Sequence, residues 1–171
     1  MRSEEKKRPS LGLDLLLLLV KLLMVAAVFA ILLFFVFGIM RCPDLSMSPA
    51  VKDGDLVIYY RLDKSYAAND VIVVDMDGEL SVRRVVAVAG DTVDITEDGL
   101  VVNGAMQQEA NIYEETNRYE EGVDFPLTVR EGQVFVLGDS RENSTDSRIY
   151  GPVDIHETKG KVMTIIRRRG I

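Results

Sequence analysis

Three short segments of the sequence concentrate residues whose side chains could take part in nucleophilic catalysis. The first is Ser46-Met47-Ser48-Pro49, the second places Arg83-Arg84 before Gly90-Asp91, and the third runs from Gly138 to Arg148. A serine hydroxyl needs a base that removes its proton as it attacks a carbonyl carbon. Ser46 is therefore a candidate nucleophile, and its chemistry depends on which group can act as that base.

The third segment contains Ser144, Asp146 and Arg148. An Asp and an Arg on one tight loop can form a charge-assisted pair that holds nearby groups in place. Asp, Ser and Asn are also ordinary turn residues, so a solvated turn is the alternative. The presence of the other two segments favours the bracing role.

The composition excludes several other kinds of chemistry. The chain has 171 residues, one His, one Cys and a formal net charge of −7. One cysteine excludes an internal disulfide framework and any multi-cysteine zinc site, and one histidine excludes a triad or metal site that needs two. The acidic balance argues against a nucleic-acid partner, because phosphate binding needs clustered Lys and Arg. The length allows one domain with an appendage.

The appendage is an apolar run over residues 15–40, interrupted only by Lys21. As a helix it would be ~39 Å long, enough to cross a hydrocarbon core of ~30 Å. It is longer than the apolar core of a cleaved signal peptide and ends without an Ala-x-Ala step. We interpret it as an uncleaved transmembrane signal anchor. The basic residues at 6–8 predict that residues 1–14 form a cytoplasmic tail and that residues 41–171 lie outside the cell membrane.

The exported part has the pattern of a β domain. Short apolar runs alternate with turn dipeptides at Asp77-Gly78, Asp98-Gly99 and Asn103-Gly104. The sequence therefore predicts a mainly β fold of curled antiparallel sheets. Residues 105–132 are polar and acidic, which predicts an elaborated loop or small subdomain. That segment is either a solvated excursion or a cap that faces the substrate.

In order, spacing and position after the anchor, the three segments resemble the type I signal peptidases of bacteria. These are membrane-bound serine endopeptidases that remove signal peptides from exported proteins, and their dyad is a Ser nucleophile with a neutral Lys as general base. The resemblance implies that Ser46 is the nucleophile, that Ser144 helps to orient the base, and that Asp146 and Arg148 brace the site. It also implies a curled antiparallel β catalytic domain and no cofactor or metal.

Two positions depart from the family pattern. Arg83 stands where the general-base lysine is expected, and an arginine stays charged and has no acceptor lone pair. Asp44, two residues before Ser46, lies in the oxyanion region, where the family usually has Gly or Ser. A carboxylate there would oppose a developing oxyanion. Asp44 and Arg83 either pair with each other or each point to solvent. His156 is interpreted as a surface residue.

The sequence thus predicts a signal peptidase I-type serine endopeptidase whose partners are the signal peptides of exported preproteins and the lipid bilayer. The alternative is a catalytically silent homologue that binds export clients or assists the assembly of surface structures. Arg83 favours the alternative, and the intact Ser46 opposes it. A self-cleaving repressor of the DNA-damage response would share a Ser–Lys dyad and a β fold, but the anchor and the acidic body weigh against it.

Overall fold

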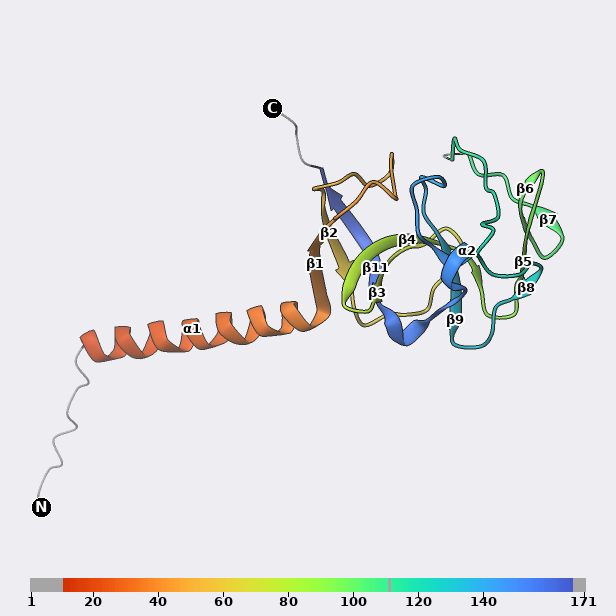
Figure 1. Cartoon of the computed structure of the whole chain (residues 1–171). Coiled ribbons are helices and arrows are strands. Elements are labelled where there is room, and N and C mark those ends of the chain that lie inside the picture. The colour runs from red at the N-terminus through yellow and green to blue at the C-terminus, as the bar shows by residue number, and fades with distance from the viewer. Residues whose placement is uncertain (1–10, 111, 168–171) are drawn as a thin grey trace, which may run out of the picture. The chain divides into compact units, whose positions relative to one another are not determined.

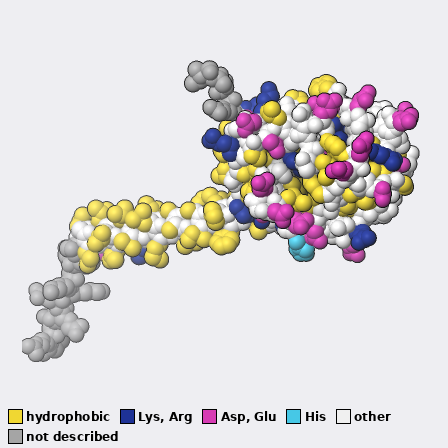
Figure 2. All heavy atoms as spheres, in the orientation of Figure 1, with side chains coloured by type: hydrophobic (Ala, Val, Ile, Leu, Met, Phe, Trp, Pro, Cys, Tyr) yellow, Lys and Arg dark blue, Asp and Glu magenta, His cyan; other side chains and the backbone are white. Residues whose placement is uncertain are grey.

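The apolar run begins as a helix of membrane-span type. In the computed structural model, which describes residues 11–110 and 112–167, helix α1 spans Leu11–Val36 (Figure 1). It has a mean hydropathy of 3.0 over its most apolar 18 residues, and none of its residues is buried. Hydrophobic side chains cover the face of α1 that Figure 2 shows. A helix that is apolar all round suits a lipid surrounding better than water.

The helix ends before the apolar run does. Phe37–Arg41 forms strand β1, which pairs antiparallel with β2 (Leu56–Tyr60). Its burial alternates, with Gly38 and Met40 buried and Ile39 exposed. The expected membrane segment, 15–40, therefore contains four residues of strand. An unbroken apolar run gives no periodicity that could mark such a change from helix to strand.

The residues after α1 form two antiparallel sheets (Figure 1), which confirms the predicted mainly β fold. In the described residues, one sheet has the strand order β1-β2-β11-β3-β4-β9-β10 and the other the order β7-β6-β5-β8. The remaining strands are β3 (Val71–Met76), β4 (Glu79–Val88), β5 (Thr92–Thr96), β6 (Gly99–Val102), β7 (Ala105–Met106), β8 (Leu127–Thr128), β9 (Gln133–Leu137), β10 (Val153–Asp154) and β11 (Thr158–Ile166). Two short helices, α2 (Ser147–Tyr150) and η1 (Ile155–Glu157), flank β10.

The predicted hairpins are present, with one shift. Asp77-Gly78 connects β3 to β4 and Asn103-Gly104 connects β6 to β7, and both turns begin with a residue at positive φ. Such turns match the right-handed twist of the strands that they join. The β5–β6 hairpin turns one residue earlier than expected, because Thr96 pairs with Gly99 and leaves residues 97–98 as the loop.

The strand that carries Arg83 is bent. β4 pairs with β3 over its first half and with β9 over its second half, and its register against β9 shifts between Val85 and Ala87. A shift of this kind bends a strand locally, and β4 curves through the middle of the domain in Figure 1. The bend lies just beyond Arg83 and Arg84, so β4 changes direction next to the candidate site.

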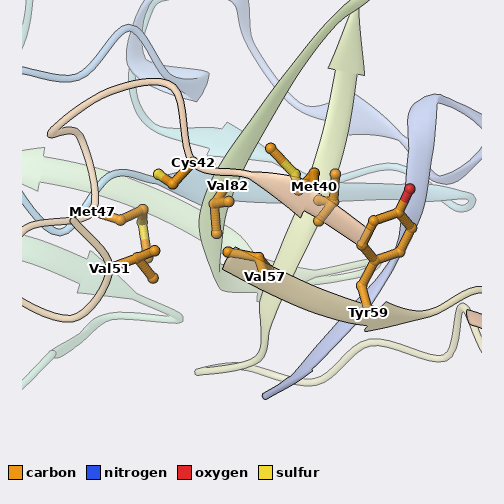
Figure 3. Packing of buried hydrophobic residues seen from close by; sticks show 8 residues of the cluster. Met40, Cys42, Met47, Val51, Val57, Tyr59 and Val82 are labelled. Carbon is orange, nitrogen blue, oxygen red and sulfur yellow. The ribbon is translucent and has the colours of Figure 1, made fainter. Parts of the chain in front are cut away.

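One of the core clusters continues from the sheet into the loop that follows β1. Met47 and Val51 of this loop are fully buried and belong to the same cluster as Val57 of β2 and Val82 of β4 (Figure 3). Cys42, which precedes Ser46, is buried in the same cluster, so the free energy of burying these side chains also fixes the backbone on both sides of Ser46.

Gly160, at the irregularity between β11 and β3, provides a test of how closely β11 packs against β2. A side chain at position 160 would collide with the backbone carbonyl of Tyr60, and its φ of 144° is unfavourable for any other residue. We expect Gly160→Ala to lower the free energy of unfolding by about 2–3 kcal/mol, as measured by denaturant titration.

Gly132→Ala is the matched control, because Gly132 also has a positive φ but a Cβ there would meet no atom within 4 Å. An equal loss for both variants would show that backbone strain, and not the approach of Tyr60, accounts for the effect at position 160.

Candidate active site

Ser46 lies in the Ser46 loop, residues 42–55, which connects β1 to β2. At the base of the loop, the backbone N–H of Cys42 donates to the carbonyl of Asp55 at 2.8 Å. The next residue after Ser46, Met47, is fully buried in the cluster of Figure 3. Ser46 itself is 1% exposed, so its side chain is held in one place by its surroundings.

The Ser46 hydroxyl has two charged partners. Its oxygen is 2.6 Å from Oδ1 of Asp44 and 2.7 Å from Nη1 of Arg83. The backbone N–H of Ser46 donates to the same Asp44 oxygen at 3.0 Å. The other Asp44 oxygen is 4.0 Å from Nη1 of Arg83, at the outer limit of an ion pair. The structure thus brings Asp44, Ser46 and Arg83 together around one hydroxyl group.

The Arg83 guanidinium is buried, with 5% of the residue exposed. It is the donor in each of the hydrogen bonds that hold it. Besides the Ser46 hydroxyl, Nη1 donates to the carbonyl of Val82 at 2.6 Å. Nε and Nη2 both donate to the carbonyl of Thr145, at 3.2 and 3.0 Å. A guanidinium has donors only, so Arg83 cannot take the proton of Ser46.

The Asp146–Arg148 pair forms the centre of the 138–148 loop. The two side chains make two parallel hydrogen bonds of 2.9 Å, and they are 0% and 2% exposed. Asp146 also caps the first turn of α2 and accepts a hydrogen bond from the backbone of Gly138 at 3.1 Å. This geometry is that of a bracing pair, since both charges are satisfied within one loop.

The 138–148 loop packs directly on the Ser46 loop. The backbone N–H of Ser140 donates to the carbonyl of Ser46 at 2.8 Å. A side chain at Gly138 would collide with Ser144 and approach the carbonyl of Ser46, so only glycine fits there. Arg84, the neighbour of Arg83, anchors the loop to β4 through two hydrogen bonds to Asp139.

The Ser144 side chain lies close to Gly138. Its hydroxyl is buried and has no hydrogen-bond partner among the described residues. The resemblance implies that Ser144 orients the base at position 83, but Arg83 bonds instead to the carbonyl of Thr145. The forked guanidinium reaches a backbone acceptor, and the serine that would face a lysine amine is left unpaired.

Sequence reasoning missed several residues that border the site. Tyr150, in α2, lines a cleft that opens beside Arg83. Burial raises the pKa of the Tyr150 hydroxyl to about 12. Glu109 forms an ion pair with Arg141, whose side chain is 1% exposed. The aromatic ring of Tyr119 lies 4.7 Å from the Arg148 guanidinium. No short motif marks these contacts, because each joins residues far apart in the sequence.

Two of these contacts connect the 105–132 segment to the 138–148 loop. Glu109 accepts a hydrogen bond from the Arg141 side chain, and the Tyr119 hydroxyl donates to the carbonyl of Arg141. It packs behind the loop that supports Ser46, on the side of Arg141 and Arg148. A role as a cap that faces the substrate stays a prediction.

A cleft of about 770 Å³ opens beside Ser46. Asp44 and Arg83, the two partners of the Ser46 hydroxyl, are both in its wall. The rest of the lining combines apolar and polar side chains from the Ser46 loop, the β3–β4 hairpin and the 138–150 region: Pro43, Met76, Asp77, Glu79, Leu80, Ser81, Thr145, Ile149 and Tyr150. Ser46 itself is buried and does not line the cleft, so a group bound there would contact Asp44 and Arg83, the two partners of its hydroxyl.

His156 lies outside this arrangement. It is exposed in η1, and its backbone N–H donates to Asp154 as part of a capping box. The interpretation of His156 as a surface residue is confirmed.

The Asp146–Arg148 pair makes a clear prediction for stability. Asp146→Ala leaves the Arg148 charge buried without its carboxylate, and such changes cost about 3–5 kcal/mol. We expect a clear decrease in the melting temperature, measured by circular dichroism or differential scanning fluorimetry.

Glu120→Ala is the control, because Glu120 is exposed in the 105–132 segment. If the two variants melted at the same temperature, the pair would contribute no more than a surface charge.

The chain is similar to known proteins over most of its length. A family model described as "Signal peptidase, peptidase S26" matches residues 15–166. Signal peptidase I of Bacillus licheniformis is 33% identical over 141 residues, which are 75% of this chain and 76% of the relative. Signal peptidase IB of Staphylococcus aureus is 34% identical over 135 residues, 68% of this chain and 71% of the relative.

A crystal structure of a signal peptidase I from Enterococcus faecalis V583 matches with 30% sequence identity and a TM-score of 0.48, covering 58% of this chain and 97% of that chain. The family match extends from within α1 to the end of β11 and includes the Ser46 loop, β4 and the 138–148 loop. The chain therefore belongs to the signal peptidase family.

Proposed function

We propose that this protein is a membrane-bound serine endopeptidase that removes signal peptides from exported proteins, with Ser46 as the nucleophile. The observation that carries the proposal is the position of the Ser46 hydroxyl. It is fixed between Asp44 and Arg83, and both of these residues line the same cleft. A peptide bound in this cleft would lie next to the two side chains that hold the buried hydroxyl in position.

The edge of β4 supports a peptide as the ligand of this cleft. β4 pairs with β3 from Glu79 onward but with β9 only from Arg84 onward. Among the described strands, none pairs with the second edge of β4 before Arg84, and Leu80 and Ser81 of this stretch line the cleft. An extended peptide can add to such an edge through backbone hydrogen bonds.

The short connection between α1 and Ser46 supports a substrate whose cleaved bond lies close to a bilayer. Ser46 follows α1 by ten residues, and α1 is long and apolar enough to span a membrane. A signal peptide keeps an apolar core just before its cleavage point, so a nucleophile close to a membrane anchor suits it. We propose that small residues of the Ala-x-Ala type precede the cleaved bond, as the family resemblance implies.

One observation favours a second function. Arg83 donates a hydrogen bond to Ser46 at the position where the family has a proton-accepting lysine. A catalytically silent homologue would keep the fold and the cleft, and would bind export clients or assist the assembly of surface structures without cleaving them.

The two functions differ in one measurement, the cleavage of a signal-peptide substrate by the full chain in detergent. For the peptidase we expect cleavage by the wild type and a loss of about 10³-fold or more in Ser46→Ala, because the variant has no group for covalent attack. Equal rates in the two proteins, or no cleavage by either, would favour the silent homologue.

The basic residues at 6–8, which lie outside the described residues, make a prediction about orientation. The positive-inside tendency should keep the N-terminus in the cytoplasm and expose the β domain on the other side. Protease added to intact cells stripped of their wall should therefore digest the β domain. Digestion only after lysis would reverse the orientation.

A further inference from the structure

The direction of the Ser46 proton follows from the chemistry of its two partners. Arg83 can only donate, so the Ser46 oxygen accepts its hydrogen bond. A serine hydroxyl has one proton, which is then left for the Asp44 oxygen at 2.6 Å. This distance is typical of an O–H donor facing a charged carboxylate. The structure thus aims the proton of the nucleophile at a carboxylate.

We propose that Asp44 is the general base of this enzyme, in place of the lysine that position 83 lacks, and that Arg83 stabilises the charge that develops on the Ser46 oxygen. This inference rests on the proposed role of Ser46 as nucleophile. It reverses the expectation that a carboxylate at position 44 only obstructs the reaction.

The placement of Asp44 suits a base better than a structural residue. Its side chain is 41% exposed and lines the cleft, so it can reach both the nucleophile and a bound peptide. The same carboxylate oxygen also accepts the backbone N–H of Ser46 at 3.0 Å, which fixes its position relative to the hydroxyl. A general base must lie within hydrogen-bond reach of the proton that it removes, and Asp44 meets this condition.

Three lysines that could act as a base have other partners in the described part of the chain. Lys64 donates to the carbonyl of Ile155, Lys159 pairs with Asp75, and Lys161 pairs with Asp70. His156 is exposed in η1. Within the described residues, the hydrogen bonds and ion pairs of these lysines do not involve Ser46.

Arg83 supplies the second half of the function. Its buried positive charge lies 2.7 Å from the Ser46 oxygen, where negative charge grows as the proton leaves. A preorganised donor in a buried site stabilises such charge more strongly than water does. In the family pattern a neutral lysine accepts the proton of the serine. In this chain Asp44 accepts the proton, and Arg83 stabilises the negative charge on the Ser46 oxygen.

The reaction then balances with no further reagent. As the Ser46 oxygen forms a bond to the carbonyl carbon of the scissile peptide, its proton moves to Oδ1 of Asp44. Protonated Asp44 gives that proton to the leaving amine nitrogen as the C–N bond breaks, which leaves an acyl ester on Ser46. Water then attacks the ester, Asp44 takes a proton from the water, and the Ser46 oxygen receives it as the second product leaves.

Asp44→Asn tests the proposal. The amide has nearly the same shape and can still accept the backbone hydrogen bond of Ser46, but it cannot take a proton. We expect kcat for a signal-peptide substrate to decrease by about 10²–10⁴-fold. KM and the melting temperature should stay close to those of the wild type. Asp53→Asn, in the same loop but exposed, is the matched control and should leave kcat unchanged.

Chemical rescue separates a base from a residue that only positions Ser46. Asp44→Gly removes the carboxylate and leaves room for a small anion, so added formate should raise its cleavage rate in proportion to formate concentration. The double variant Asp44→Gly, Ser46→Ala should show no rescue. Asp44→Gly also replaces Asp44→Asn if the latter fails to fold.

The outcomes separate this proposal from the proposed function. If Ser46→Ala is inactive while Asp44→Asn cleaves at the wild-type rate or faster, Ser46 is the nucleophile and Asp44 is not its base. Absence of formate rescue in a folded, inactive Asp44→Gly would also overturn the role as base. A wild type without Ser46-dependent cleavage would overturn both proposals.

Discussion

A buried guanidinium must find an acceptor for each of its donors, and this constraint shapes the whole centre of the β domain. Arg83 makes four hydrogen bonds: one to the Ser46 hydroxyl, one to the carbonyl of Val82 and two to the carbonyl of Thr145. These acceptors belong to three separate parts of the chain: the Ser46 loop, β4 and the 138–148 loop. The Arg83 guanidinium cannot become neutral by losing a proton. If one of these three segments moved away, part of a buried charge would lose its hydrogen bonds.

Behind this contact lies a second layer of charge. Asp146 and Arg148 satisfy each other in the 138–148 loop, and Arg84 ties the same loop to β4 through Asp139. The 105–132 segment adds Glu109 and Tyr119 from the far side of the loop. These contacts hold a largely irregular loop from several sides, which a site with fixed geometry needs.

The sequence alone could predict the mainly β fold, two of the three hairpin turns in place, and the Asp146–Arg148 pair, because each leaves a local pattern. It also brought Asp44 and Arg83 into one region by resemblance. It could not predict the contact of Arg83 with the carbonyl of Thr145. Every residue has a backbone carbonyl, so the residue type at position 145 does not indicate this bond. The same holds for the end of α1 at Val36, where apolar residues continue into β1.

The contacts of Ser46 differ in how they are connected along the chain. Asp44 is two residues away on the same loop, and it binds both the backbone and the hydroxyl of Ser46. Arg83 is 37 residues away, on β4. If the Ser46 loop shifts against the sheet, for example when a peptide enters the cleft, Asp44 travels with the serine while Arg83 stays behind. The contact between Asp44 and Ser46 is therefore set by the local sequence, whereas the contact between Arg83 and Ser46 depends on how the loop lies against β4.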